Sequence, residues 1–246
     1  MSRSPHAGTQ LALDVRLRDG SSFDNFHDRP NREALAHIRA AVRRVTARPH
    51  GAPFEQIFLW GGAGCGKTHL MEAAAREFHD AGLAPAYVSL RPGTTVAPCI
   101  LEGLDSCPLV CLDDLHLAGG NRDWETALLH LYERKRVAGG LLLAAASSGP
   151  AQPAALLPDL ATRLGAGLVF RLLPLGDDEK LAALRLRARS RGLEMGEEVA
   201  RYVLSRYPRD THALFRLLDR IDRKSLAAQR RLTIPFLRLL QDEDGL

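Results

Sequence analysis

Residues 58–70 read FLWGGAGCGKTHL, and the centre of this stretch has the spacing Gly-x-x-x-x-Gly-Lys-Thr. The apolar run before it predicts a buried strand, and the run after it predicts a helix. A glycine-rich loop at a helix N-terminus lets backbone N–H groups surround phosphate oxygens, and the helix dipole favours the same anion. The stretch therefore predicts a phosphate-binding loop.

The residues of this loop have different expected roles toward a bound nucleotide. Lys67 is expected to reach the β- and γ-phosphates, and the Thr68 hydroxyl is expected to ligate Mg²⁺. The other contacts with ADP or ATP are expected from Gly61, Gly62, Ala63, Gly64, Cys65, Gly66 and His69.

Strand and helix signals alternate around this loop. An amphipathic helix is predicted between residues 31 and 48, helices at 68–82 and 124–139, and buried strands at 56–60, 86–90, 109–115, 140–147 and 167–172. Near-continuous apolar strands separated by helices predict an α/β fold, with a parallel sheet covered by helices on both faces. After residue 174 the patterns are helical only, at 177–192, 197–207, 211–222 and 233–242, with 225–231 expected to be helical as well.

These patterns divide the chain into three parts. We expect a flexible tail over residues 1–20, an α/β phosphate-loop domain over 21–173, and a small all-helical lid subdomain over 174–246.

The strand predicted at 109–115 carries two acidic residues, Asp113 and Asp114, near its end. In parallel sheets, ligands gather at the carboxyl ends of the strands. We therefore assign Asp113 to the Mg²⁺ side of the site and expect Asp114 to polarise a water molecule as a catalytic residue. Without the phosphate loop upstream, such a pair would indicate only a solvated turn.

Composition limits the setting in which the chain can act. The net charge of +4 and the pI of about 9.1 suit contact with nucleic acid or an acidic partner but demand neither. No apolar run is long enough to span a membrane, and the N-terminus lacks the apolar core of a secretory signal. We therefore expect a cytoplasmic protein.

Several stretches resemble a known family. A phosphate-loop domain followed by a helical lid is similar to the AAA+ ATPases, and GKTHL and FDNF (23–26) resemble the bacterial replication initiator DnaA and its close relatives. The stretches VCLDDL, WETALLHLYER, LPDLATRL and LTIPFLRLL resemble the DnaA-homologous regulatory inactivators of that initiator. In this family the FDNF segment lies against the adenine, which implies contacts from Phe23 and Phe26.

The resemblance also implies roles for three polar positions. Arg163 stands where the family carries its arginine finger, a catalytic side chain offered to ATP bound in a neighbouring DnaA subunit. An intrachain salt bridge is the alternative. The polar sensor position falls on Ser147 or Ser148, and His212 stands where DnaA-like proteins present a lid arginine, although it could equally be a residue of the lid surface. At the sensor position, serine is shorter than the asparagine or aspartate of many relatives, and in the lid a histidine takes the place of the arginine. Both departures weaken the case for fast hydrolysis of the chain's own nucleotide.

The N-terminal sequence QLALDV resembles the hexapeptide by which these inactivators bind the replicative sliding clamp. An extended peptide on a flexible leader can dock in an apolar groove. An edge strand or a plain tail is the alternative. The residues concerned are Gln10, Leu11, Ala12, Leu13, Asp14 and Val15.

The resemblance implies an ADP-bound regulator that stimulates hydrolysis of DnaA-bound ATP and so prevents re-initiation of chromosome replication near the replisome. One alternative is a helicase-loader-like or stand-alone AAA+ ATPase that acts through its own hydrolysis, and another is an adaptor that bridges clamp and initiator without catalysis. Because the chain ends directly after the lid, no helix-turn-helix is expected. Self-association stays open, and DNA or an acidic partner could be contacted by the arginine-rich run of Arg185, Arg187, Arg189 and Arg191.

Overall fold

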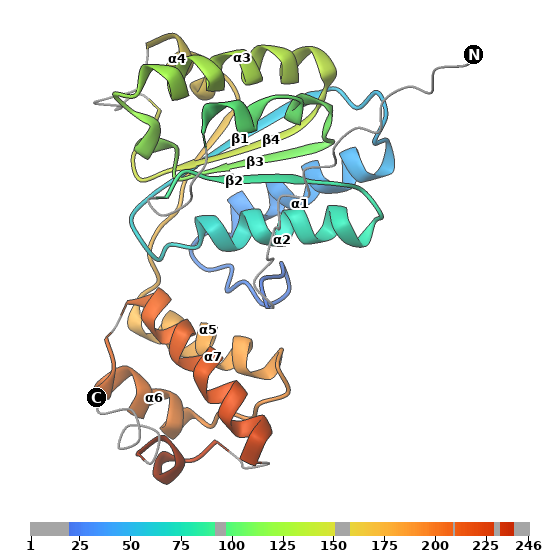
Figure 1. Ribbon diagram of the computed structural model, residues 1–246. Coiled ribbons are helices and arrows are strands. Elements are labelled where there is room, and N and C mark those ends of the chain that lie inside the picture. The colour runs from blue at the N-terminus through green and yellow to red at the C-terminus, as the bar shows by residue number, and fades with distance from the viewer. Residues whose placement is uncertain (1–19, 92–96, 151–157, 209, 229–231, 239–246) are drawn as a thin grey trace, which may run out of the picture.

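The computed structural model describes residues 20–91, 97–150, 158–208, 210–228 and 232–238. Figure 1 shows an α/β domain and, beside it, a bundle of helices formed by the C-terminal part of the chain. This is the predicted fold class, and its layers follow from the apolar patterns described above.

The described residues form a five-stranded parallel sheet with the strand order β2-β3-β4-β1-β5. Its strands are β1 (Phe54–Trp60), β2 (Ala86–Ser89), β3 (Leu109–Asp113), β4 (Gly140–Ala146) and β5 (Leu168–Arg171). The predicted parallel sheet is therefore confirmed. Because all strands run the same way, their carboxyl ends lie along one edge of the sheet, and β1 delivers the glycine loop there between β4 and β5.

Successive side chains of the strands enter two separate cores, as the period of two in a strand requires. Ile57 and Leu59 of β1 pack with α1 (Arg32–Ala47) and α2 (Lys67–Asp80) on one face. Phe58 packs on the other face with α3 (Arg122–Ala138) and α4 (Pro158–Gly165). Figure 1 shows these two pairs of helices on opposite sides of the sheet. The predicted covering of both faces is therefore confirmed.

The ends of α3 show how local sequence fixes an element. The Asn121 side chain accepts a hydrogen bond from the backbone N–H of Trp124 at 3.3 Å, which caps the first turn. At the other end Gly139 has φ +84°, and a Cβ there would lie 2.2 Å from the Ala52 carbonyl oxygen. Only glycine allows this approach, so β4 can begin directly at the next residue.

The structure departs from the sequence prediction at the end of the third strand. β3 ends at Asp113, two residues earlier than predicted, because Asp114 has a left-handed φ of +59° that turns the chain into the 3₁₀ helix η3 (Leu115–Ala118). The 3₁₀ helices η1 (Pro98–Leu101) and η2 (Leu104–Ser106) likewise have no counterpart in the prediction.

The lid has its own hydrophobic core. It is built from α5 (Asp177–Arg189), α6 (Glu197–Arg206) and α7 (Thr211–Ala228), and residues 234–238 are also helical. Acidic residues begin α5, and the Glu179 carboxylate accepts a hydrogen bond from the Gly176 N–H at 2.7 Å. The lid core contains Leu184, Ala188, Val203, Leu214, Leu218 and Leu237.

The segment before α1 forms hydrogen bonds with the lid and with the chain that leads into it. The Asn31 amide exchanges two hydrogen bonds with the backbone of Leu173, at 3.0 and 2.8 Å, and thereby fixes the chain between β5 and α5. Asn25 contacts the Ser190 hydroxyl at the end of α5 at 3.4 Å. In the described ranges, none of the helices has both the length and the apolar character needed to cross a membrane.

Candidate functional site

The glycine loop connects the end of β1 to the first residue of α2, Lys67. Gly66 has φ +100°, and a Cβ at this position would lie 2.7 Å from the Phe26 ring. The Lys67 ammonium lies over the loop and donates to the carbonyls of Gly61 at 2.7 Å and Gly62 at 3.0 Å. The loop, its lysine and the N-terminus of α2 therefore form one cationic end of the site.

The Asp113 carboxylate lies beside this end and is almost fully buried. Its Oδ2 accepts hydrogen bonds from the Thr68 hydroxyl at 2.7 Å and from the Tyr87 hydroxyl at 2.8 Å. Its Oδ1 accepts from the backbone N–H of Asp114 at 2.9 Å. Burial raises the pKa of Tyr87 well above its usual value and the Asp113 charge raises it further, so Tyr87 stays a proton donor.

The Asp114 carboxylate is held by a different partner. Arg91, which follows β2, donates from Nε to Asp114 Oδ2 at 2.6 Å. The sequence prediction of the site did not include Arg91, because its closeness to Asp114 depends on the pairing of β2 with β3.

Lys67, Thr68 and Asp114 are among the residues that line a cleft of about 350 Å³, within the range of roughly 300–1,000 Å³ typical of small-molecule sites. The α/β domain and the lid both line this cleft, and they meet at the loop, where a Cβ at Gly64 would lie 3.3 Å from the Asp210 carboxylate. The α/β domain contributes Ser21, Ala63, Gly64, Gly66, Lys67, Thr68, His69, Glu72, Arg91, Asp114, His116 and Ser147, and the lid contributes Arg187, Asp210, Thr211, Phe215, Arg216 and Asp219.

The donor set suits a nucleotide with Mg²⁺ better than a metal held by protein alone. Among the described residues, no group of three or more His, Cys, Asp or Glu side chains could hold a metal ion. Thr68 and Asp113 nevertheless bring a hydroxyl and a carboxylate together beside the loop. Mg²⁺ in phosphate sites commonly takes one or two such ligands and completes its shell with water and phosphate oxygens.

A smaller cavity of about 40 Å³ adjoins the loop and is lined by Phe26 and His69, among others. The rings of these two residues lie 5.4 Å apart. Phe23, by contrast, is buried in the core against α1 and α2, so only the second aromatic residue of FDNF faces a cavity that could take a base.

His69 is fixed by contacts on both ring nitrogens. Its Nε2 lies 2.9 Å from the Ser22 carbonyl oxygen, and its Nδ1 lies 3.4 Å from the Arg187 guanidinium of the lid. The pKa of His69 is lowered from 6.5 to about 4, mainly by burial; the hydrogen bond with the Ser22 carbonyl acts against this shift, and the charge of Arg187 adds to it. The ring is therefore neutral near pH 7, donating to Ser22 and accepting from Arg187.

Of the expected sensor positions, Ser147 is the one that lines the cleft among the described residues. The Ser147 backbone N–H donates to Nδ1 of His116 at 3.3 Å. His212 lies in the first turn of α7, and its side chain falls outside the described part of the structure. Arg216, four residues further on this helix, lines the cleft and was not anticipated from the sequence.

Arg163 lies in α4, on the side of the sheet covered by α3, and is not among the described residues that line the cleft. Its guanidinium forms ion pairs with Glu133 and Asp159, which is the intrachain salt bridge named above as the alternative. The hydrogen bond from Arg163 holds the pKa of Glu133 below its usual value. The arginine side chain is 33% exposed, so it remains open to solvent beside these carboxylates.

The end of α4 is fixed to β1 by side-chain hydrogen bonds. The buried Gln56 side chain donates from Nε2 to the Leu164 carbonyl at 2.6 Å and to the Arg163 carbonyl at 3.1 Å. Two carbonyls at the helix end thus have a partner, and the backbone of Arg163 is fixed to β1.

The arginine-rich run at the end of α5 and in the turn after it does not form one surface. Arg185 and Arg189 are exposed, whereas Arg187 is buried against the Phe215 ring and Arg191 pairs with Asp219. The expectation that all four could face DNA or an acidic partner is therefore wrong for Arg187 and Arg191. The proposed clamp peptide, residues 10–15, lies outside the described residues.

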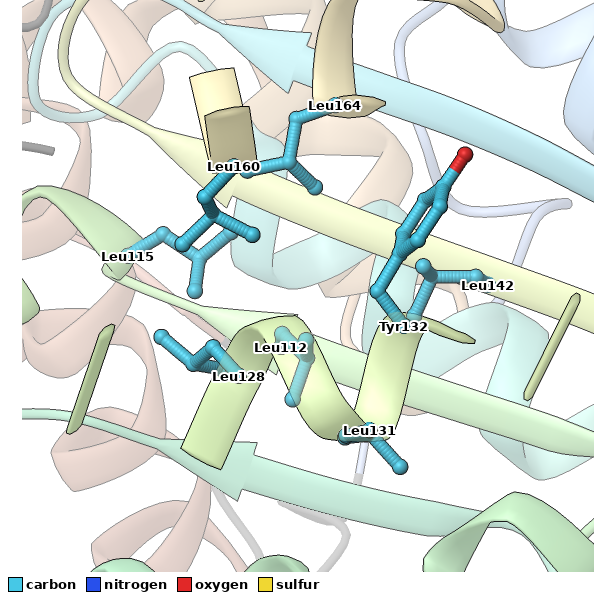
Figure 2. A pocket seen from close by; sticks show the side chains of 8 residues that line it. All are labelled: Leu112, Leu115, Leu128, Leu131, Tyr132, Leu142, Leu160 and Leu164. Carbon is cyan, nitrogen blue, oxygen red and sulfur yellow. The ribbon is translucent and has the colours of Figure 1, made fainter. Parts of the chain in front are cut away.

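Figure 2 shows a further cavity, lined by side chains of β3, η3, α3, β4 and α4. Seven leucines and Tyr132 surround a void of about 10 Å³. This is about the space of one water-sized probe, and the lining is apolar. The void is therefore a packing gap in the core and not a ligand site.

The parallel sheet, the phosphate loop with its acidic pair and the helical lid over the cleft define an AAA+ fold. Residues 17–89 match the family model of the bacterial DnaA ATPase domain, and residues 177–240 match the model of the Hda lid domain. The chain belongs to the DnaA-related AAA+ proteins, and its lid is of the Hda type.

Solved structures support this fold. A structure of the replication initiator DnaA bound to AMPPCP and single-stranded DNA has 20% sequence identity with this chain and a TM-score of 0.65. The match covers 82% of this chain and 64% of the DnaA chain, which is less than two thirds of the DnaA length. Domain III of DnaA from Thermotoga maritima has 18% identity and a TM-score of 0.69, and the match covers 91% of this chain and 96% of that domain. The Holliday junction branch migration motor RuvB from Thermotoga maritima also matches, at 17% identity and a TM-score of 0.59. This match covers 86% of this chain and 68% of the RuvB chain.

Proposed function

We propose that this protein is a regulatory inactivator of DnaA that binds ADP or ATP with Mg²⁺ in the cleft between sheet and lid. The observation that carries the proposal is the combination of a DnaA-type ATPase domain with an Hda-type lid around a cleft lined by loop residues, Lys67, Thr68 and Asp114. The AMPPCP in the DnaA structure supports a nucleotide as the ligand.

In this proposal the chain's own nucleotide is a structural ligand, with ADP as the form that persists. Phosphates would contact the loop while the lid residues close over the base and ribose. The Asp114 carboxylate is engaged by Arg91, and Ser147 is a short side chain at the sensor position. Both features favour slow turnover of the bound nucleotide.

The catalytic contribution to DnaA would come from Arg163 acting in trans. A guanidinium next to the γ-phosphate in a neighbouring subunit neutralises charge in the transition state and is worth roughly 10³–10⁵ in rate in related systems. For this role the guanidinium must exchange Glu133 and Asp159 for phosphate oxygens. Both ion pairs are partly exposed to solvent, and pairs of this kind are weak enough to exchange.

The remaining parts of the proposal concern location and partners. The QLALDV peptide would bind the sliding clamp and bring the protein to the replisome in the cytoplasm, where DnaA–ATP is its target. The exposed pair Arg185 and Arg189 could add a weak contact with DNA inside the clamp.

One experiment tests the proposal against its alternatives. ATP turnover is measured for this protein alone, for DnaA alone, and for both together with clamp loaded on DNA. Fast hydrolysis by the mixture only is expected. Fast hydrolysis by this protein alone would instead indicate a stand-alone or loader-like ATPase, and a mixture no faster than its parts would indicate a bridging adaptor.

The Arg163→Ala variant separates binding from catalysis. We expect unchanged nucleotide affinity, because Arg163 lies outside the cleft residues, and loss of the stimulation of DnaA hydrolysis. Arg136→Ala is the matched control, since Arg136 also contacts Glu133, at 3.3 Å, and should leave stimulation intact. Full stimulation by Arg163→Ala would remove this residue from the mechanism.

The Gln10→Ala variant tests the clamp peptide. It should lose retention on immobilised clamp while its circular dichroism spectrum and nucleotide affinity stay those of the wild type. Retention equal to the wild type would discard the peptide as a clamp ligand.

A further inference from the structure

The buried part of β1 begins with a polar side chain. Gln56 is 6% exposed, and the apolar residues 57–59 that follow it are buried as well. A carboxamide in such a position costs free energy unless hydrogen bonds compensate for the lost water. Its Nε2 donates to the Leu164 carbonyl at 2.6 Å and to the Arg163 carbonyl at 3.1 Å. The buried amide is therefore engaged by the end of α4.

The residue before β5 leaves room for this side chain. Strand β5 pairs with β1 from Leu168 opposite Ile57, so Gly167 lies beside Gln56. A Cβ at Gly167 would lie 2.7 Å from the Gln56 carbonyl oxygen, and 3.0 and 3.1 Å from the Cβ and Cγ of Gln56. A side chain at position 167 would therefore press on the glutamine that holds α4.

Three kinds of contact hold the end of α4 that carries Arg163. Leu160 and Leu164 are buried in the core on the α3 side of the sheet. The Arg163 guanidinium pairs with Glu133 and Asp159, and the helix backbone accepts the two hydrogen bonds from β1. In the proposed reaction the guanidinium exchanges both carboxylates for phosphate oxygens, so these ion pairs are lost. Apolar contacts are non-directional, and the hydrogen bonds from β1 then remain as directional contacts between the helix end and the sheet.

We propose that Gln56 is a positioning residue, which holds the backbone of Arg163 so that the guanidinium is presented to the triphosphate in the neighbouring subunit. The inference rests on the proposed role of Arg163. A catalytic group misplaced by about 1 Å can lose roughly 10²-fold in rate. Gln56 is not among the described residues that line the nucleotide cleft. Its loss therefore affects the reaction in the neighbouring subunit and leaves the chain's own nucleotide affinity unchanged.

The test titrates each variant against DnaA–ATP with clamp loaded on DNA, and separates the maximal stimulation of hydrolysis from the concentration that gives half of it. Gln56→Met keeps the length of the side chain and removes the N–H donors. We expect the maximal stimulation to fall about tenfold, while the half-maximal concentration and the ADP affinity stay within about twofold of the wild type.

A control variant separates positioning from a general loss of stability. Ile38 is fully buried in α1, on the face of the sheet opposite α4. Ile38→Val removes one buried carbon and should lower the melting temperature of the protein. It should leave the maximal stimulation unchanged, because the hydrogen bonds to α4 are intact.

Two glycine variants test the same contact without changing the amide. Gly167→Ala places a Cβ 2.7 Å from the Gln56 carbonyl oxygen, so it should displace the glutamine or the strand and lower the maximal stimulation. For Gly165→Ala, the nearest of the neighbouring atoms is in the Pro150 side chain at 3.7 Å, an ordinary contact, and stimulation should stay intact. This pair decides the question if Gln56→Met does not fold.

Hydrogen exchange gives a readout that does not need DnaA. The Ala166 N–H donates to the Arg163 carbonyl at 3.1 Å, which is one of the two carbonyls held by Gln56. Its exchange should be about threefold faster or more in Gln56→Met and in Gly167→Ala, and unchanged in Ile38→Val, because loss of local hydrogen bonds eases local opening.

The outcomes separate this inference from the proposed function. Full maximal stimulation by folded Gln56→Met, or a change confined to its half-maximal concentration, would overturn the inference while Arg163→Ala still loses stimulation. Unchanged exchange of the Ala166 N–H would overturn it as well. If the wild type does not stimulate DnaA, or if Arg163→Ala stimulates fully, the proposed function fails and the positioning role fails with it.

Discussion

The Asp113 carboxylate provides the sharpest test of how the site is built. The substitution Asp113→Asn keeps the shape of the side chain and replaces one oxygen with an NH₂ group. In the wild type, Oδ2 accepts from Thr68 and Tyr87, and Oδ1 accepts from the Asp114 N–H. The amide cannot accept at both positions, so in either orientation at least one buried donor loses its acceptor.

The size of the effect follows from these contacts. If the NH₂ group faces the two hydroxyls, they must rotate or lose their acceptor. If it faces the Asp114 N–H, that donor cannot rotate away. Hydrogen bonds to a charged group contribute about 1.5–3 kcal/mol each, so we expect the free energy of unfolding to fall by about 2–4 kcal/mol. Tyr87→Phe removes one donor and leaves the carboxylate with two, so it should cost only about 1 kcal/mol.

The assay is urea unfolding of the nucleotide-free protein followed by circular dichroism, with the slope m as a check that the unfolded surface is unchanged. Asp113→Asn should also weaken the Mg²⁺ dependence of nucleotide binding, whereas Tyr87→Phe should retain it. A stability equal to or above that of the wild type would refute the reasoning. It would mean that burying the Asp113 charge costs at least as much as its three hydrogen bonds return.

Other perturbations test separate contacts. Because the pKa of His69 is lowered to about 4 in the fold, the unfolded chain binds the proton more readily, and the wild type should lose about 2 kcal/mol of unfolding free energy between about pH 7 and about pH 5. His69→Gln should remove this part of the pH dependence, and an unchanged slope would show that the ring is not neutral in the fold. Gly66→Ala places a Cβ 2.7 Å from the Phe26 ring at φ +100°, whereas Gly82→Ala, at φ +74°, meets no atom within 4 Å, so melting temperature and ADP affinity should both fall more for the first variant. Leu70→Ala empties a fully buried position of α2 and should cost about 2–5 kcal/mol in urea unfolding, and a loss below about 1 kcal/mol would contradict the described core.

Part of the site could be derived from the sequence because its signals are local or follow from one rule of sheet geometry. The spacing of Gly61, Gly66 and Lys67 between two apolar runs predicts strand, loop and helix directly. The meeting of Thr68 with Asp113, at 2.7 Å, follows from the rule that parallel strands end at a common edge. The switch from strand periods to helical periods after residue 174 likewise predicted the lid.

Other parts depended on how side chains pack between elements. Phe23 and Phe26 lie three residues apart in one motif, yet one enters the core and the other faces a cavity beside the loop. The difference in burial between Arg185 and Arg187 could have been predicted from their spacing, because side chains two residues apart on a helix point to nearly opposite sides. Which side faces the lid interior was set by the packing of α5 against the other lid helices.

The sequence by itself determined the fold class, the phosphate loop and the acidic pair, because each depends on contacts close along the chain or on a general property of parallel sheets. Only the tertiary structure decided that Arg91 holds Asp114 and that Glu133 and Asp159 hold Arg163. A charged side chain has many possible partners in the sequence. The partner it binds is fixed by strand register and helix packing, which join residues far apart along the chain.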